Sequence, residues 1–280
     1  MPPLPDYASQ MAAYHSAFAS ELRAMIESLP IADTAKVLDV ACGDGTYSRW
    51  LSLRFGPKGG VWGVDVSPAY LEAASKTTDR GPSPERILYT VADLNRLPFP
   101  PGSFDLAWCA QSLFSLPEPV NALKTIASAV RPGGLVAVLE SDTLHQVLLP
   151  WPIELELALR AAELSALAES SEHPRKYYVG RRLRQVFESA GLENIERRSR
   201  TMDRQAPLDQ PTREFLASYL ADLLECTRDR LPDSAAEQSR RYLDPSSSDY
   251  LLDWPDLAIS VLEHVVWGQV GSRSTGLPTA

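Results

Sequence analysis

The sequence has few of the residues on which metal and disulfide chemistry depend. Only 3 cysteines and 4 histidines occur among its 280 residues. Cys42, Cys109 and Cys226 are widely spaced, form no C-x-x-C pair and have no histidine at metal-ligand spacing. Cys42 and Cys109 fall on stretches that we expect to be buried, where a free cysteine behaves as a small apolar residue. The pattern predicts reduced, structural cysteines and no metal site.

Long apolar runs and an excess of positive charge are also absent. No apolar stretch approaches the roughly 18 residues that a membrane span requires. The first residues, MPPLPDYASQ, lack the basic and apolar regions of a signal peptide. The formal net charge of −9 disfavours a surface built to hold nucleic-acid phosphates. We therefore expect a cytoplasmic protein with no membrane or nucleic-acid partner, in an oligomeric state that the sequence leaves open.

What the sequence does have is an alternation of short apolar runs with helical segments. Runs typical of buried strands lie near residues 36–41, 61–66, 86–92, 104–110 and 134–140. Helices are predicted near residues 46–55, 68–78, 117–130 and 152–170. This order predicts an α/β fold with a doubly wound parallel sheet, Rossmann-like in character. Right-handed crossovers place the carboxyl ends of the strands at one edge, where ligands bind.

A turn of small residues follows the first of these strands. It reads Ala41-Cys42-Gly43-Asp44-Gly45 and leads into a predicted helix start, so backbone N–H groups are available to a ligand. A dinucleotide-binding turn needs a third glycine, and Ser48 occupies that position. Asp39, at the end of the strand, would repel a pyrophosphate and suits a cationic ligand. These residues predict a nucleoside site without phosphates, which disfavours a nucleotide-dependent dehydrogenase.

The segment VLDVACGDG resembles motif I of the class I S-adenosylmethionine-dependent methyltransferases, with Ala41 in place of the first glycine. The resemblance extends to the strand Val61–Asp65, to Val91–Leu94, to the strand that starts at Ser103, and to the turn Arg131–Gly134. It covers roughly residues 31–145. It implies S-adenosylmethionine as cofactor and S-adenosylhomocysteine as product.

The resemblance also implies roles for individual residues. Asp65 is expected to accept both ribose hydroxyls, and Asp93 to accept the adenine amino group, with the Leu94 backbone N–H on a ring nitrogen. The residues expected at the cofactor are Asp39, Ala41, Gly43, Gly45, Asp65, Val66, Asp93, Leu94, Ala110 and Gln111.

Three parts of the chain are predicted around this motif. Residues 1–30 have apolar side chains at helical spacing and are expected to form lid helices over the cofactor. Residues 31–204 and 259–272 form the methyltransferase core, whose sheet has seven strands, the sixth at 192–200 and an antiparallel seventh at 259–270. Residues 205–258 form an inserted helical cap over the acceptor pocket.

The acceptor site is expected beyond the ends of the fourth and fifth strands. His145 is the first candidate for a general base or an acceptor-orienting group, because an imidazole titrates near neutral pH. Glu140 and Asp142 are weaker candidates, since either carboxylate can instead bind backbone amides. Aromatic residues in the later half of the chain indicate a flat or bulky apolar acceptor, the alternative being that they are plain core. The expected acceptor contacts are Tyr14, His15, Phe114, Trp151 and Tyr178.

These observations favour a methyltransferase of the quinone-biosynthesis and natural-product branch. It would move a methyl group to a small apolar or aromatic metabolite by in-line displacement. Methylation of RNA or protein is the alternative enzyme function, and the negative net charge counts against it. A non-catalytic S-adenosylmethionine-binding partner protein is the third, because Asp39, Asp65 and Asp93 do not separate binding from turnover. The identity of the acceptor and the choice between O-, N- and C-methylation stay open.

Overall fold

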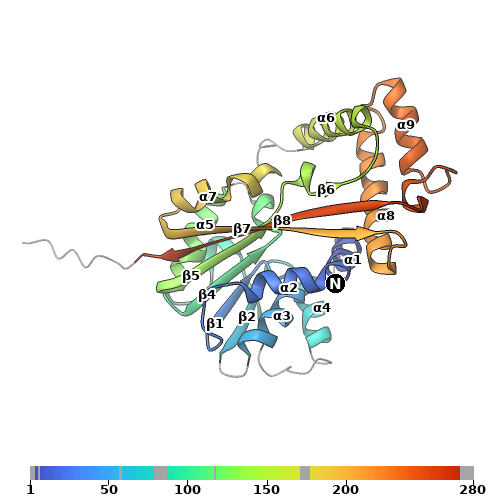
Figure 1. The fold of residues 1–280 in the computed structure, drawn as a ribbon. Coiled ribbons are helices and arrows are strands. Elements are labelled where there is room, and N and C mark those ends of the chain that lie inside the picture. Colours follow the sequence, from blue (N-terminus) through green and yellow to red (C-terminus); the bar gives the residue numbers. More distant parts are fainter. Residues whose placement is uncertain are drawn as a thin grey trace, which may run out of the picture.

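The computed structural model describes residues 4–5, 7–56, 59–78, 87–116, 118–170 and 177–271. Within these residues one mixed sheet of eight strands forms the centre, in the order β3-β2-β1-β4-β5-β8-β6, with β7 paired to β8 (Figure 1). Some predicted elements include residues outside this set: residues 1–3 and 6 of the predicted lid, residue 86 of the third strand, residue 117 of the third helix and residue 272 of the core.

The parallel half of the sheet confirms the five predicted strands. They are β1 (Lys36–Val40), β2 (Gly60–Asp65), β3 (Ile87–Val91), β4 (Phe104–Ala110) and β5 (Val130–Glu140). β1 lies between β2 and β4, and each pair is parallel. Both faces of β1 are buried, because Val37 packs in one apolar core and Leu38 and Val40 pack in the other. This explains why its sequence is a near-continuous apolar run rather than an alternating one.

Helices cover both faces of the sheet. They include α3 (Thr46–Phe55), α4 (Pro68–Thr78), α5 (Pro119–Ala129) and α7 (Val179–Ser189). Successive residues of β5 point to opposite faces of the sheet. Ala137 packs in the apolar core between the sheet and the helices α2 and α3, whereas Val138 packs in the core between the sheet and the helices α5 and α7. The doubly wound α/β fold is therefore confirmed. The described sheet has eight strands rather than the seven predicted, because the two-residue strand at Val147–Leu148 also pairs with the final strand.

An antiparallel region completes the sheet. It consists of β6 (Val147–Leu148), β7 (Leu192–Gln205) and β8 (Ala258–Val270). β8 pairs with β5, β6 and β7, which confirms the predicted antiparallel final strand. β7 continues five residues beyond the predicted end at 200, because β8 supplies a partner along its whole length.

The N-terminal segment forms two helices, α1 (Ala8–Ala17) and α2 (Ala19–Glu27). Three further helices, α6 (Ile153–Ser170), α8 (Gln210–Thr227) and α9 (Asp233–Leu243), pack on one another beyond the end of the sheet (Figure 1). We call α6, α8 and α9 the helical layer. The buried leucines Leu155 and Leu159 of α6 share one apolar cluster with Leu216 and Leu220 of α8, and this cluster extends into the sheet. The predicted assignment of α6 to the core and of residues 205–258 to a separate cap stays a prediction.

Short 3-10 helices occupy several strand ends and loops: η2 (Leu94–Arg96), η3 (Leu113–Ser115), η4 (Thr143–His145) and η6 (Leu251–Asp253). In the ranges that the structure describes, no helix is both long and apolar enough to cross a membrane.

Candidate active site

The glycine turn after β1 has a backbone that most residues avoid. Ala41, Gly43 and Gly45 have positive φ angles of 54°, 53° and 74°. A Cβ atom on Gly45 would lie 2.3 Å from the Tyr89 hydroxyl, whereas one on Gly43 would meet no atom within 4 Å. Gly45 is therefore required for packing, and Gly43 leaves open space beside the turn.

Asp65, the last residue of β2, ties the second strand to this turn. Its Oδ2 accepts from the Gly43 N–H at 2.9 Å and its Oδ1 from the Ser67 N–H at 2.8 Å. Each carboxylate oxygen has a second lone-pair site that a hydroxyl can use. Val66, the next residue, is 71% exposed at the same edge. This arrangement suits the predicted ribose contact, which stays a prediction.

Asp39 has a different position from Asp65. Its carboxylate is buried and accepts from the Ser48 hydroxyl at 2.5 Å, and burial raises its pKa to about 7. The serine that replaces the third glycine thus binds the acid at the end of β1 and holds the start of α3 against the sheet. A direct contact of Asp39 with the cofactor stays a prediction.

The ends of β3 and β4 lie at the same edge. The Ala92 N–H donates to the Asp65 carbonyl at 3.0 Å, which brings the exposed Asp93 and the following Leu94 next to β2. On the other side of β1, Ala110 ends β4, and Gln111 follows with a φ of 50°. The open space at Gly43 and the acids at the ends of β2 and β3 fit a nucleoside, so the chain can hold S-adenosylmethionine here.

The predicted acceptor contacts Tyr14 and His15 of α1 lie at this edge. His15 Nε2 is 3.1 Å from Gln111 Oε1, and the His15 ring meets Tyr47 edge-on at 5.0 Å between centroids. The Tyr14 hydroxyl donates to Glu263 Oε1 at 2.5 Å. α1 therefore closes over the end of β4 and the middle of β8.

Sequence interpretation missed Glu263. It lies on β8 with no exposed surface, and burial raises its pKa to about 7. Its Oε1 also accepts from Gln111 Nε2 at 3.2 Å and from Gln146 Nε2 at 3.0 Å. We call these residues the Glu263 cluster: Tyr14, His15, Gln111, Gln146 and Glu263. The signal that could have found it is an acid inside the apolar run ISVLEHVVWGQV.

His145 and the other predicted acceptor contacts do not belong to the Glu263 cluster. The His145 side chain is exposed, its ring centroid lies 6.4 Å from that of Tyr178, and partial burial and Arg181 lower its pKa. Phe114 lies 6.2 Å from Tyr177 between ring centroids. Trp151 is buried, and its indole N–H donates to Glu156 of α6. The roles of His145, Phe114, Trp151 and Tyr178 stay predictions.

The two acids beside His145 bind backbone amides. Glu140 Oε1 accepts from the N–H groups of Leu113 at 2.5 Å and Phe114 at 3.2 Å, and burial raises its pKa to about 8. Asp142 Oδ1 accepts from the Arg181 N–H at 3.1 Å. Both carboxylates hold neighbouring segments in place.

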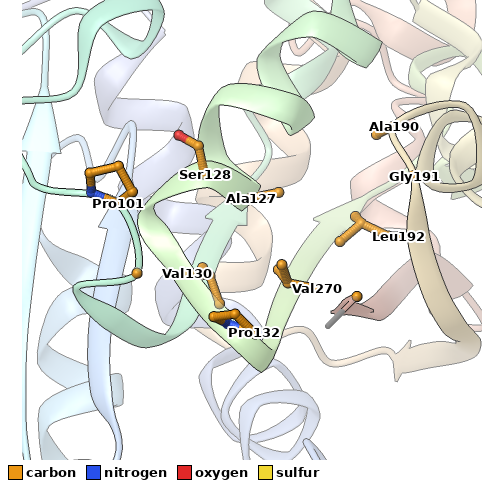
Figure 2. Close-up of a pocket in the computed structure, with 11 residues that line it drawn as sticks. Pro101, Ala127, Ser128, Val130, Pro132, Ala190, Gly191, Leu192 and Val270 are labelled. Atoms are coloured by element: carbon orange, nitrogen blue, oxygen red, sulfur yellow. The ribbon is translucent and has the colours of Figure 1, made fainter. Parts of the chain in front are cut away.

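A pocket of about 440 Å³ lies elsewhere in the molecule (Figure 2). Its lining includes Pro101, Val130, Leu192 and Val270. These residues lie at the amino ends of β4 and β5, opposite the glycine turn. Since ligands of such sheets bind beyond the carboxyl ends of the strands, we do not assign this pocket to the cofactor or the acceptor. Among the described residues, no group of three or more His, Cys, Asp or Glu side chains is placed to hold a metal ion.

Comparison with known proteins agrees with this geometry. A family model described as a methyltransferase domain matches residues 37–134. The chain is 30% identical over 192 residues to the demethylmenaquinone methyltransferase of Staphylococcus aureus, covering 63% of this chain and 76% of that enzyme. It is 32% identical over 114 residues to the methyltransferase GfsG of Streptomyces halstedii, covering 41% of this chain and only 40% of GfsG.

Two solved structures share the fold. The YcgJ protein of Bacillus subtilis has a TM-score of 0.54 at 16% identity, covering 91% of this chain and 99% of that one. Phosphoethanolamine N-methyltransferase 2 of Haemonchus contortus, in complex with S-adenosyl-L-methionine, also has a TM-score of 0.54 at 16% identity, covering 94% of this chain and 58% of that one. The chain belongs to the class I S-adenosylmethionine-dependent methyltransferases. It is an enzyme of that class, and S-adenosylmethionine is its cofactor.

Proposed function

We propose that this enzyme methylates a small apolar or aromatic molecule and releases S-adenosylhomocysteine. The observation that carries the proposal is a group of aromatic rings between the cofactor edge and the helical layer. Tyr14 lies 5.2 Å from Phe215 of α8 and 5.3 Å from Phe18 between ring centroids. Rings in these arrangements favour a flat apolar partner over a polar one.

The relatives support the same class of acceptor. The S. aureus relative is named for demethylmenaquinone, and the alignment with it extends well beyond the cofactor motif, over 192 residues. We also propose that the helical layer, rather than residues 205–258 alone, caps the acceptor, because α6 packs against α8 and α9. α1 acts as the lid, with core residues 31–204 and 259–272 below it.

The bound cofactor supplies an electrophilic methyl group, so the chain has to align the acceptor and exclude water. Asp65 and Asp93 would hold the ribose and adenine, together with the open turn at Gly43. His15 and Gln111 would close the edge toward the acceptor. His145, exposed near Tyr178, would orient an acceptor that enters between η4 and α7.

The experiment is an acceptor screen that measures S-adenosylhomocysteine release and the mass of the methylated product. Naphthoquinols and phenols represent the apolar aromatic class, with ethanolamine, a bulk RNA and a denatured protein as polar alternatives. We expect methyl transfer to the aromatic class alone. Transfer to the RNA, the protein or ethanolamine instead would contradict the proposal.

A further inference from the structure

Glu263 is a charged residue in an apolar part of the sheet. It has no exposed surface, and its neighbours on the same face of β8 are Val261 and Val265. Arg200 lies opposite it in the β7–β8 register, but the Arg200 side chain is exposed. Burial of a carboxylate is costly unless its oxygens are bound, so its position requires an explanation.

The two oxygens of this carboxylate differ sharply. Oε1 accepts from three side chains, Tyr14, Gln111 and Gln146. Oε2 is equally buried and has no hydrogen-bond partner among the described residues. Leaving a buried carboxylate oxygen without a hydrogen bond is unfavourable. Three donors fix the orientation of the carboxylate, and the second oxygen is left free to receive a ligand donor.

The surroundings of the Glu263 cluster indicate which ligand can donate a hydrogen bond to Oε2. Gln111 connects Glu263 to the end of β4 at the cofactor edge, and Gln146 connects it to the link between β5 and β6. Tyr14 covers it from the lid and contacts Phe215 of the helical layer. The carboxylate thus lies between the cofactor edge and the aromatic rings that we assign to the acceptor.

We propose that Glu263 Oε2 binds the hydroxyl group of an aromatic acceptor and takes its proton during methyl transfer. This inference rests on the proposed function and adds the chemical class of the acceptor, a hydroxylated aromatic molecule. The hydroxyl O–H bond breaks and its proton passes to Oε2. The oxygen keeps the electron pair, which forms the bond to the methyl carbon, and the methyl–sulfur bonding pair leaves with the sulfur.

The environment of Glu263 suits a proton acceptor near neutral pH. Burial raises its pKa to about 7, and a base works best when its pKa lies close to the working pH. The titratable groups that face it are Tyr14 of α1, Tyr47 of α3 and Glu140 of β5, whereas the adjacent His264 points to the other face of the sheet and binds Ser199. Burial raises the pKa of both tyrosines, so they stay neutral around pH 7.

The test compares 2-naphthol, which carries a hydroxyl donor, with its methyl ether 2-methoxynaphthalene, which does not, by calorimetry with S-adenosylhomocysteine bound. Wild type should bind 2-naphthol at least about tenfold more tightly, as expected for one hydrogen bond to a charged group. In Glu263→Gln an NH₂ group replaces Oε2, so the preference should fall to within about twofold, while affinity for S-adenosylhomocysteine is retained.

Glu140→Gln is the matched control, because it makes the same change at another buried carboxylate, whose amide oxygen can still accept the Leu113 and Phe114 N–H groups. It should keep the wild-type preference. A second measurement needs no Glu263 variant: in wild type and in Glu140→Gln, the preference should weaken as the pH falls through about 7, because a protonated Glu263 no longer accepts.

Three results would overturn the inference. One is an equal affinity of wild type for the two naphthalenes, and another is an unchanged preference in Glu263→Gln. The third is a loss of S-adenosylhomocysteine binding in Glu263→Gln, which would assign Oε2 to the cofactor. Since none of these measurements requires turnover, their outcome is separate from the acceptor screen, whose failure would instead contradict the proposed function.

Discussion

Two carboxylates lie at the same edge of the sheet and are held in opposite ways. Asp65 accepts backbone N–H groups from Gly43 and Ser67, one on each oxygen. Glu263 accepts side-chain donors from α1, from the end of β4 and from the β5–β6 link, all on one oxygen. The first site joins the end of β2 to the turn after β1, 22 positions away, and the second joins segments more than 100 positions apart. The proposed cofactor site is thus built by neighbouring strand ends, whereas the proposed acceptor site depends on how the lid and the sheet pack.

Replacement of Asp65, which we assign to the cofactor site, should have the largest effect, a loss of S-adenosylmethionine affinity. We expect Asp65→Ala to weaken S-adenosylmethionine binding by at least about 100-fold, because two charge-assisted hydrogen bonds are worth roughly 1.5–3 kcal/mol each. Asp105→Ala is the control, since Asp105 pairs with Arg131 at the opposite edge. Near-normal binding by Asp65→Ala in calorimetry would refute the ribose assignment.

The glycine turn offers a matched pair of substitutions. Gly45→Ala should lower the free energy of unfolding by about 2–4 kcal/mol, because a Cβ there overlaps Tyr89 and the positive φ adds strain. Gly43→Ala has the same type of φ but no neighbour, so about 1–2 kcal/mol is expected. Urea unfolding measures both, and equal losses would contradict the packing role of Gly45.

Glu263→Gln should change how stability depends on pH. The folded pKa of about 7 lies above the ordinary value of 4.5, so in this interval the folded state binds more protons than the unfolded state. Stability supplied by the protonated form is full below the ordinary pKa and is lost as the pH rises through about 7. The variant lacks this pH-dependent loss. Its free energy of unfolding, relative to that of wild type, should therefore rise by roughly 2–3 kcal/mol between about pH 5 and pH 8. Thermal unfolding that gives parallel pH profiles for the two proteins would show that the carboxylate is not destabilised by burial.

His145→Ala should have the smallest effect. Because the side chain is exposed, one hydrogen bond of about 0.5–1.5 kcal/mol corresponds to a roughly two- to tenfold decrease in kcat. Cofactor affinity should not change. An unchanged kcat with an identified acceptor would leave His145 with no part in acceptor orientation.

Much of the fold could be predicted from the sequence, because its signals are local. The apolar runs predicted β1 to β5, and the helix predicted near residues 68–78 is α4, which begins at Pro68. Pro232 directly precedes α9 and cannot continue a helix interior, which separates α9 from α8. The periodicity of α6 shows that it has an apolar face, but the partners of that face in α8 and α9 are visible only in the structure.

The sequence by itself determined the methyltransferase class and the cofactor, and it predicted the edge of the sheet at which the cofactor binds. A glycine turn and acids at strand ends carry that information within a few residues, since parallel strands must end at the same edge. Tertiary structure alone decided that Glu263 meets Tyr14, Gln111 and Gln146, residues separated from it by more than 100 positions. The physical reason is that burial and side-chain hydrogen bonds arise from packing between distant segments, which no local pattern encodes.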